Sequence, residues 1–249
     1  MSAASSYDGS SRFCKPNLSV SANAASVYSV VKNIEWIRVP AGGPVERDFE
    51  IAKYPVTNAQ YAEYLQAIEP AEAAKRYCRL MEEHFFGGIM KDYSPKPGFE
   101  KKPVVFVSWY DAQTFAKWAG GRLPTAAEWR KAAAWLPTEN RHAKYCTGED
   151  ELPTQSNAVF YDDDNGWALP APHLADVDWY RPAGAYGLCG MAGNVAEWVD
   201  SEMSNDWKLA LGGSLFRPVE QTLTDSSEGD APEKRLSTFG FRICRRCSV

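Results

Sequence analysis

The side chains that could carry chemistry in this chain are few and widely separated. His84, His142 and His173 share no ligand spacing, so a zinc or iron site made from them would have to be assembled by folding. The six cysteines are scattered along 249 residues, a pattern that suits reduced thiols better than a disulfide framework. The pair in "CRRC" (244–247) has the spacing of half a zinc site, but no second pair occurs elsewhere. We therefore expect no metal at this pair.

Nucleophile and phosphate motifs are missing from the sequence. It contains neither a Gly-rich phosphate loop nor a Gly-x-Ser-x-Gly elbow. "GGSLF" (212–216) offers a serine without an assignable base, and a turn-capping or buried serine is the more common case. Oxygen ligands of the kind that Ca²⁺ binds gather in "NAVFYDDDNGW" (157–167), although their spacing departs from the EF-hand pattern. On spacing alone, a solvated acidic loop is the simpler interpretation.

The stretch "GMAGNVAEWV" (190–199) places a flexible bend before a carboxylate and a tryptophan. Gly190 and Gly193 allow unusual backbone angles, and Asn194 tolerates the left-handed region. Carbonyls turned inward beside Glu197 could hold a hard cation. The same bend could instead be a tight turn that docks the indole of Trp198 in the core.

Composition excludes several classes of partner. The net charge of −5 argues against a broad basic face, so we expect no nucleic-acid partner. No apolar run approaches the length that spans a bilayer, and the first residues lack a secretion signal. We therefore expect no membrane insertion. The expected location is the cytoplasm, or export without a signal peptide, as for a virion-associated protein.

The elements that must position these residues are mostly in the first half of the chain. Residues 1–28 are rich in Ser and Ala and predict a flexible arm, so that 29–249 form a single domain. Strands are predicted in 34–43 and 48–56. Capping-box patterns predict three helices, which begin after Thr57, Ser108 and Thr125. After residue 138 the helical periodicity disappears, which predicts a second half dominated by loops.

Several motifs together resemble one family. "FEIAKYPVTNAQYAEYL", "GRLPTAAEW", "MAGNVAEW", "GGS" and "GFRICR" occur in the order found in the formylglycine-generating enzyme, or sulfatase-modifying factor, family. The resemblance covers about 34–246. It implies an α+β fold, an irregular C-type-lectin-like domain with few helices, small antiparallel sheets and long loops.

The resemblance also allows the chemistry of the family to be tested. One branch oxidises a substrate cysteine with copper and a cysteine pair that lies between the Gly-Gly-Ser turn and the Gly-Phe-Arg strand. Here that interval (215–239) contains no cysteine, so the soft ligands of copper are missing. A second branch, the sulfoxide synthases, takes its iron-binding histidines from a separate helical domain that this chain is too short to contain. We therefore expect neither copper nor iron.

Two cation sites are implied by the resemblance alone, and we expect structural Ca²⁺ in at least one of them. In the first, a family Asp or Asn ligand falls on Gly190. The implied ligands are Gly193, Val195 and Glu197 in the first site and Asn157, Ala158, Asn165 and Trp167 in the second.

A third branch of the family has no known catalysis and consists of hypervariable binding proteins diversified by retroelements. An intact scaffold without catalytic cysteines predicts a non-catalytic protein of this general kind, which binds an unknown protein or small-molecule ligand. The surface from Leu215 to Thr238 would display the contacts, with Phe216 as an aromatic anchor. The predicted contacts are Leu215, Phe216, Arg217, Glu220, Gln221, Thr222, Thr224, Asp225, Ser226 and Glu228.

Two other functions stay open at this point. A metal-dependent oxidoreductase with a rearranged iron or copper site would use His84, His142 or His173 with carboxylates from 162–178. A structural subunit of a larger assembly would need no site at all.

Overall fold

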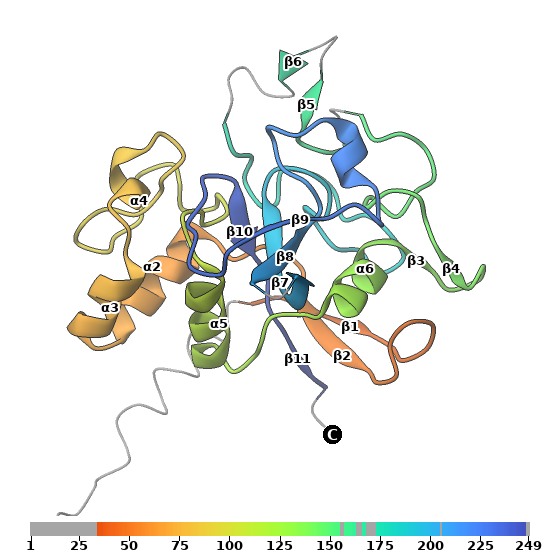
Figure 1. Cartoon of the computed structure of the whole chain (residues 1–249), viewed down its shortest axis with the longest axis horizontal. Helices are drawn as coiled ribbons and strands as arrows, with labels where there is room; N and C mark the ends of the chain where they lie inside the picture. Colours follow the sequence, from red (N-terminus) through yellow and green to blue (C-terminus); the bar gives the residue numbers. More distant parts are fainter. Residues whose placement is uncertain (1–33, 155–156, 163–165, 168–172, 205, 248–249) are drawn as a thin grey trace, which may run out of the picture.

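The computed structural model describes residues 34–154, 157–162, 166–167, 173–204 and 206–247. The predicted arm (1–28) lies outside these residues. Within them no helix is both long enough and apolar enough to cross a membrane. Strands occupy the middle of the molecule, most of the helices gather on one side, and α6 lies on the other side (Figure 1).

Two small sheets form the centre of the fold. One is antiparallel with the order β1-β2-β11, so the last strand pairs with the hairpin near the start of the described chain. The other has the order β10-β7-β8-β9, and its β10–β7 pair is parallel whereas the other two pairs are antiparallel. Two-stranded pairs β3-β4 and β5-β6 complete the set. The strands are β1 (Trp36–Val39), β2 (Phe49–Ala52), β3 (Trp135–Leu136), β4 (Arg141–His142), β5 (Tyr161–Asp162), β6 (Gly166–Trp167), β7 (Ala196–Ser204), β8 (Trp207–Leu211), β9 (Glu228–Asp230), β10 (Phe239–Phe241) and β11 (Cys244–Arg246).

All three predicted capping boxes are present. Thr57, Ser108 and Thr125 each accept a hydrogen bond from the backbone three residues later, and the side chain at that position bonds back to the cap. Two further short helices, α3 and α4, were not predicted, because neither begins with a side-chain cap. The helices are α2 (Asn58–Ala67), α3 (Pro70–Arg76), α4 (Leu80–Glu83), α5 (Trp109–Trp118) and α6 (Ala126–Ala134), with the 3₁₀ turn η1 (Val219–Thr222).

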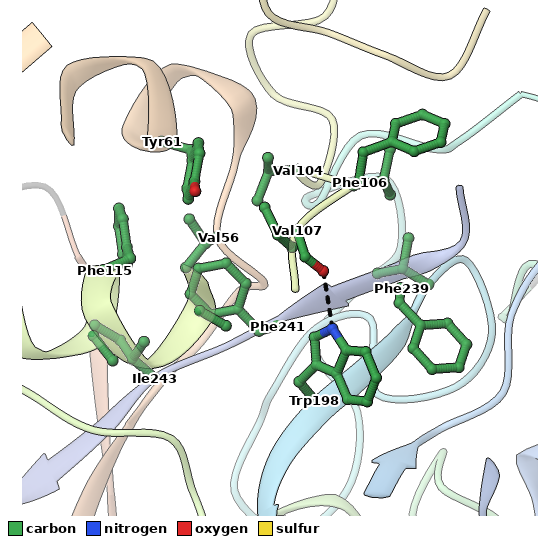
Figure 2. Packing of buried hydrophobic residues seen from close by; sticks show 14 of the residues in the cluster. Val56, Tyr61, Val104, Phe106, Val107, Phe115, Trp198, Phe239, Phe241 and Ile243 are labelled. Carbon is green, nitrogen blue, oxygen red and sulfur yellow. Dashed lines mark hydrogen bonds between the residues drawn. The ribbon is translucent and has the colours of Figure 1, made fainter. Parts of the chain in front are cut away.

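The core is divided into two hydrophobic clusters. The first lies between α2, α5 and the β10–β7 pair and contains Phe115, Trp198 and Phe241. Figure 2 shows Trp198 in this cluster, where its indole N–H donates a 3.0 Å hydrogen bond to the Val107 carbonyl. The second cluster lies around α6 and contains Trp129. Strand β7 contributes to both clusters, because Trp198 belongs to the first and Val199 to the second.

The bend before β7 docks this strand against the rest of the molecule. Gly193 has φ +69°, and a Cβ there would lie 2.0 Å from the Val159 carbonyl oxygen, so only glycine fits. Asn194 has φ +64°, and its amide both accepts from the Ala175 N–H and donates to the Ala175 carbonyl. The bend therefore seats the indole of Trp198, as the second of the two interpretations predicted.

Substitution of Trp129 would measure how much the second hydrophobic cluster contributes to stability. The side chain of Trp129 is buried, and its indole N–H donates a 2.7 Å hydrogen bond to Glu197. We expect Trp129→Ala to lower the free energy of unfolding by about 3–5 kcal/mol, because it leaves a large cavity. Trp129→Phe keeps most of the packing but loses the donor, so its cost should be about 1–2 kcal/mol in chemical denaturation. Equal costs for the two variants would show that the cavity is not the dominant effect.

Candidate functional site

The predicted display surface, residues 215–238, is partly framework. Leu215 is buried, and its N–H donates to the Asn194 carbonyl in the bend before β7. Thr222 and Thr224 are also buried, with their hydroxyls bonded to the carbonyls of Val219 and Ala143. A macromolecular partner cannot reach these three buried side chains, so they serve as framework on this surface, and contact with a small ligand stays a prediction for them.

The other predicted contacts lie at or near the surface. Phe216 is 43% exposed, and Arg217, Glu220 and Asp225 are exposed. Gln221 accepts a 3.1 Å hydrogen bond from the hydroxyl of Ser226, so these two polar groups hold each other. Glu228 pairs with Arg217. Their role in binding stays a prediction.

Phe216 belongs to an aromatic cluster that the sequence did not reveal. Its ring centroid lies 5.4 Å from that of Phe86, which in turn lies 4.0 Å from Phe85. His84 stacks on Phe85 at 4.6 Å and meets Phe106 edge-on at 5.0 Å. Phe86 and Phe106 are buried, whereas Phe85 is 51% exposed. We call the three more exposed members, His84, Phe85 and Phe216, the aromatic face.

The backbone around this cluster is tightly constrained. Helix α4 ends at Glu83, and the Phe86 N–H donates a 3.1 Å hydrogen bond to Nδ1 of His84. Phe106 has φ +60°, an unfavourable conformation for a bulky residue. It is held there by a 3.0 Å hydrogen bond from its N–H to the Leu236 carbonyl, near the end of the display surface. Hydrogen bonds from backbone N–H groups therefore hold the His84–Phe86 segment and Phe106 in place.

An ion pair follows the aromatic face in sequence. Arg217 lies 3.2 Å from one oxygen of Glu228, whose side chain is only 12% exposed, while that of Arg217 is 55% exposed. The other oxygen of Glu228 is buried and has no hydrogen-bond partner among the described residues. Burial raises the pKa of Glu228, and the Arg217 charge opposes that rise. A donor on a ligand could satisfy this oxygen.

The far end of the display surface is anchored by the buried carboxylate of Asp111. This residue caps α5 through Ser108, and it also accepts a 2.8 Å hydrogen bond from Nε of Arg235. Arg235 donates a second bond of 2.7 Å to the Lys75 carbonyl. The exposed residues of the display surface therefore lie between two fixed ends, at Leu215 and at Arg235.

The carboxylate of Glu197 is engaged by an arginine. Arg242 donates to both of its oxygens, at 2.6 and 2.8 Å, and the Trp129 indole donates to one of them. All three side chains are buried. A guanidinium lies against the carboxylate that the family resemblance assigned to Ca²⁺, and a second cation there would be repelled. In this arrangement Glu197 is the partner of Arg242, and its role as a metal ligand stays a prediction.

The remaining predicted cation ligands stay untested. Gly193 and Val195 are buried in the bend beside Glu197. Asn157 uses its side-chain oxygen to accept the Thr154 N–H, and the Ala158 carbonyl accepts the Tyr180 hydroxyl. Asn165 and the side chain of Trp167 lie outside the described residues.

The structure does not bring the three histidines together. His84 lies in the aromatic face, His142 packs edge-on against Trp135 at 5.0 Å, and His173 is exposed. Where side chains are described, no group of three or more His, Cys, Asp or Glu is placed to hold a metal ion. Asp176 and Asp178, from the predicted carboxylate stretch, pair with Lys102 and Lys101.

The described buried thiols are also unsuited to nucleophilic chemistry. Burial raises the pKa of Cys146 to about 12 and also raises those of Cys189 and Cys244. Because the thiolate is the reactive form, these residues are inert at neutral pH. They fill space in the core.

Glu197→Gln should separate an ion pair from a calcium site. The variant leaves Arg242 buried without its charged partner, so we expect a loss of about 3 kcal/mol in the free energy of unfolding. The loss should be the same in calcium and in chelator, measured by chemical denaturation. Glu202→Gln is the matched control, since Glu202 pairs with Lys208 at the surface and should cost under about 1 kcal/mol. A deficit that disappears in chelator would restore the calcium interpretation.

The aromatic face should make stability depend on pH. Burial and the nearby Lys96 charge lower the pKa of His84 below its ordinary value of 6.5. The unfolded chain therefore takes up a proton at a higher pH than the folded chain does, so stability is complete above pH 6.5 and falls as the pH drops through the folded pKa.

The measurement is the free energy of unfolding between neutral pH and mildly acidic pH, compared with that of His84→Gln. Burial also lowers the pKa of His142, so the comparison isolates the share of His84. We expect a shallower slope in the variant. Identical slopes would show that His84 titrates alike in both states.

Comparison with known proteins agrees with this architecture. Residues 18–247 match the family described as the sulfatase-modifying factor enzyme 1-like domain. A hercynine oxygenase of Mycolicibacterium thermoresistibile is 35% identical over 239 residues, which cover 78% of this chain and 50% of that protein. The chain spans less than two thirds of the length of such curated relatives.

Solved structures give the same fold. CarF superposes with a TM-score of 0.61 at 22% identity, covering 86% of this chain and 99% of its own. Treponema denticola variable protein 1 has a TM-score of 0.57 at 18% identity, covering 86% and 92%. With its irregular α+β architecture of few helices and small sheets, the chain belongs to the formylglycine-generating enzyme, or sulfatase-modifying factor, family and has its C-type-lectin-like fold.

Proposed function

We propose that this protein is a non-catalytic binding protein that recognises a protein partner through the aromatic face and the adjoining pair Arg217–Glu228. One observation carries the proposal. The interval that holds the catalytic cysteines in the family instead places Phe216, 43% exposed, in the same cluster as Phe85, 51% exposed. Exposed aromatic side chains held on a rigid base are typical of binding surfaces.

The chemistry of the surface indicates what the partner presents. Phe85 and Phe216 offer apolar contact, and both lie against the buried ring of Phe86, so little conformational entropy is lost on binding. Arg217 is half exposed and can take a second carboxylate, while the unpartnered oxygen of Glu228 can accept a donor. The matching partner is a protein segment with an apolar side chain next to charged groups.

A protein diversified by a retroelement is one specific form of this proposal. The exposed residues between Leu215 and Arg235 could vary without disturbing either fixed end. A template repeat of the 3′ end of the gene beside a reverse-transcriptase gene would support this form, and its absence would remove it.

The test uses peptides selected from a displayed random library against the wild-type protein. Phe85→Ser, Phe216→Ser and Arg217→Glu should each weaken binding of the selected peptides by about tenfold or more, as expected for central contacts. The melting temperatures of the two Phe variants should stay close to that of the wild type, whereas Arg217→Glu should lower it, because a second carboxylate then faces the buried Glu228. Trp207→Ser is the control, because Trp207 is 46% exposed but lies in β8, outside the aromatic face. Binding that survives all three substitutions, or unfolding by all three, would contradict the proposal.

The competing function is a metal-dependent oxidoreductase, which the 35% identity to a hercynine oxygenase favours. That proposal needs iron or copper held by His84, His142 or His173, and these residues lie on separate elements. Metal analysis of purified protein, with iron and copper supplied during expression, tests it directly. Near-stoichiometric iron or copper, lost on substitution of a histidine, would replace the binding proposal.

A further inference from the structure

A second candidate site lies beside α6 and is lined by none of the residues of the aromatic face. A pocket of about 650 Å³ is lined by Arg130 from α6, by residues 142–144 at β4 and by residues 223–225 after η1. In Figure 1, α6 and β4 lie on the right, whereas α4, which leads into His84 and Phe85, lies on the left. None of the residues that line the pocket belongs to the aromatic face.

The pocket presents two basic side chains without acidic partners. Arg130 and Lys144 both line it, and no ion pair joins either of them to a carboxylate in the part of the chain that the structure describes. Two acidic groups outside the lining, Glu139 and Asp150, are already paired with Arg141, at 2.6 Å and 2.7 Å. Unpaired positive charge at a concave surface is notable in a chain of net charge −5.

Arg130 is also held in position. Its Nε donates a 2.9 Å hydrogen bond to the Thr224 carbonyl, which fixes one edge of the guanidinium. The remaining N–H groups stay available for a ligand, and a guanidinium matches the geometry of carboxylate and phosphate. Ala143 and Leu223 add apolar surface to the same lining.

The other two titratable groups limit what can bind. Burial, together with the Arg130 charge, lowers the pKa of His142, so this ring is neutral at pH 7. Asp225 lines the pocket as well and carries a negative charge. Two cations and one anion leave a net charge of +1, which suits a small anionic group and disfavours a polyanion such as nucleic acid.

We propose that this pocket binds a small organic anion, a carboxylate or a phosphate attached to an apolar group. Arg130 and Lys144 hold the anionic head, and Ala143 and Leu223 contact the apolar part. The site is independent of the aromatic face, so either proposal can fail without the other.

The test titrates the whole chain with phenyl phosphate, benzoate, inorganic phosphate and, as a neutral probe, phenol. We expect binding of phenyl phosphate or benzoate with a Kd below about 1 mM, and weaker binding of inorganic phosphate and phenol. The first two probes distinguish a phosphate from a carboxylate ligand. Absence of binding by both up to about 10 mM would overturn the proposal.

Two variants and a matched control locate the site. Lys144→Gln and Arg130→Gln should each weaken binding about tenfold, because each removes a charge-assisted contact. Lys117→Gln removes the same charge from an exposed position on α5 and should change nothing. Binding that is unaffected by both pocket variants, or weakened equally by Lys117→Gln, would show that the anion binds elsewhere.

A spectroscopic readout is independent of affinity. A bound anion should raise the pKa of His142, measured by NMR titration with and without phenyl phosphate, and leave that of His84 unchanged. Phe85→Ser should bind the anion as the wild type does. An unchanged pKa of His142 at saturating probe would contradict the proposed position.

Discussion

The buried ion pair between Arg242 and Glu197 is the interaction on which the rest of the structure depends. Besides both carboxylate oxygens, the guanidinium donates to the carbonyls of Ala52, Lys53, Cys189 and Gly190. It therefore joins the end of β2, the bend before β7 and β7 itself, while the Trp129 indole adds α6 to the same carboxylate. Burying two charges is costly unless every donor is satisfied, and here the surrounding backbone supplies the acceptors. A second half with so little regular structure is thereby fastened to the first.

The sequence predicted the features that depend on neighbouring residues. The three capping boxes and the bend at Gly193 and Asn194 follow from local hydrogen bonds and backbone angles, so their residue types were sufficient to find them. The motifs also identified the fold.

The features that could not be predicted depend on contacts between residues that are far apart in the sequence. A glutamate at position 197 could either bind calcium or pair with Arg242. The sequence is the same in both cases, so only the fold can distinguish them. The aromatic face was missed for the same reason, because Phe85 and Phe216 are far apart in sequence and neither is unusual alone.

The display surface combines a buried frame with exposed positions. Leu215, Thr222 and Thr224 are buried and bonded to the backbone, whereas Phe216, Arg217 and Asp225 are open to solvent. The two candidate sites use different parts of this same segment, its start for the aromatic face and its middle for the anion pocket. Substitutions at the exposed positions of this segment would therefore change its surface and leave its buried frame in place.

The parallel pairing of β10 with β7 sets a minimum length for the chain between β9 and β10. Parallel neighbours cannot be joined by a turn of two residues, since the chain must return to the same end of the sheet. Strand β8 makes that return once, because Leu211 and Gly240 both lie opposite Glu197, but β9 then runs antiparallel to β8 and leaves the chain at the other end. Residues 231–238 therefore have to cross back to the start of β10. Shortening residues 231–238 would strain the strand pairing, whereas lengthening the connections on either side of β9 costs little, so the chain can gain surface here more easily than it can lose it.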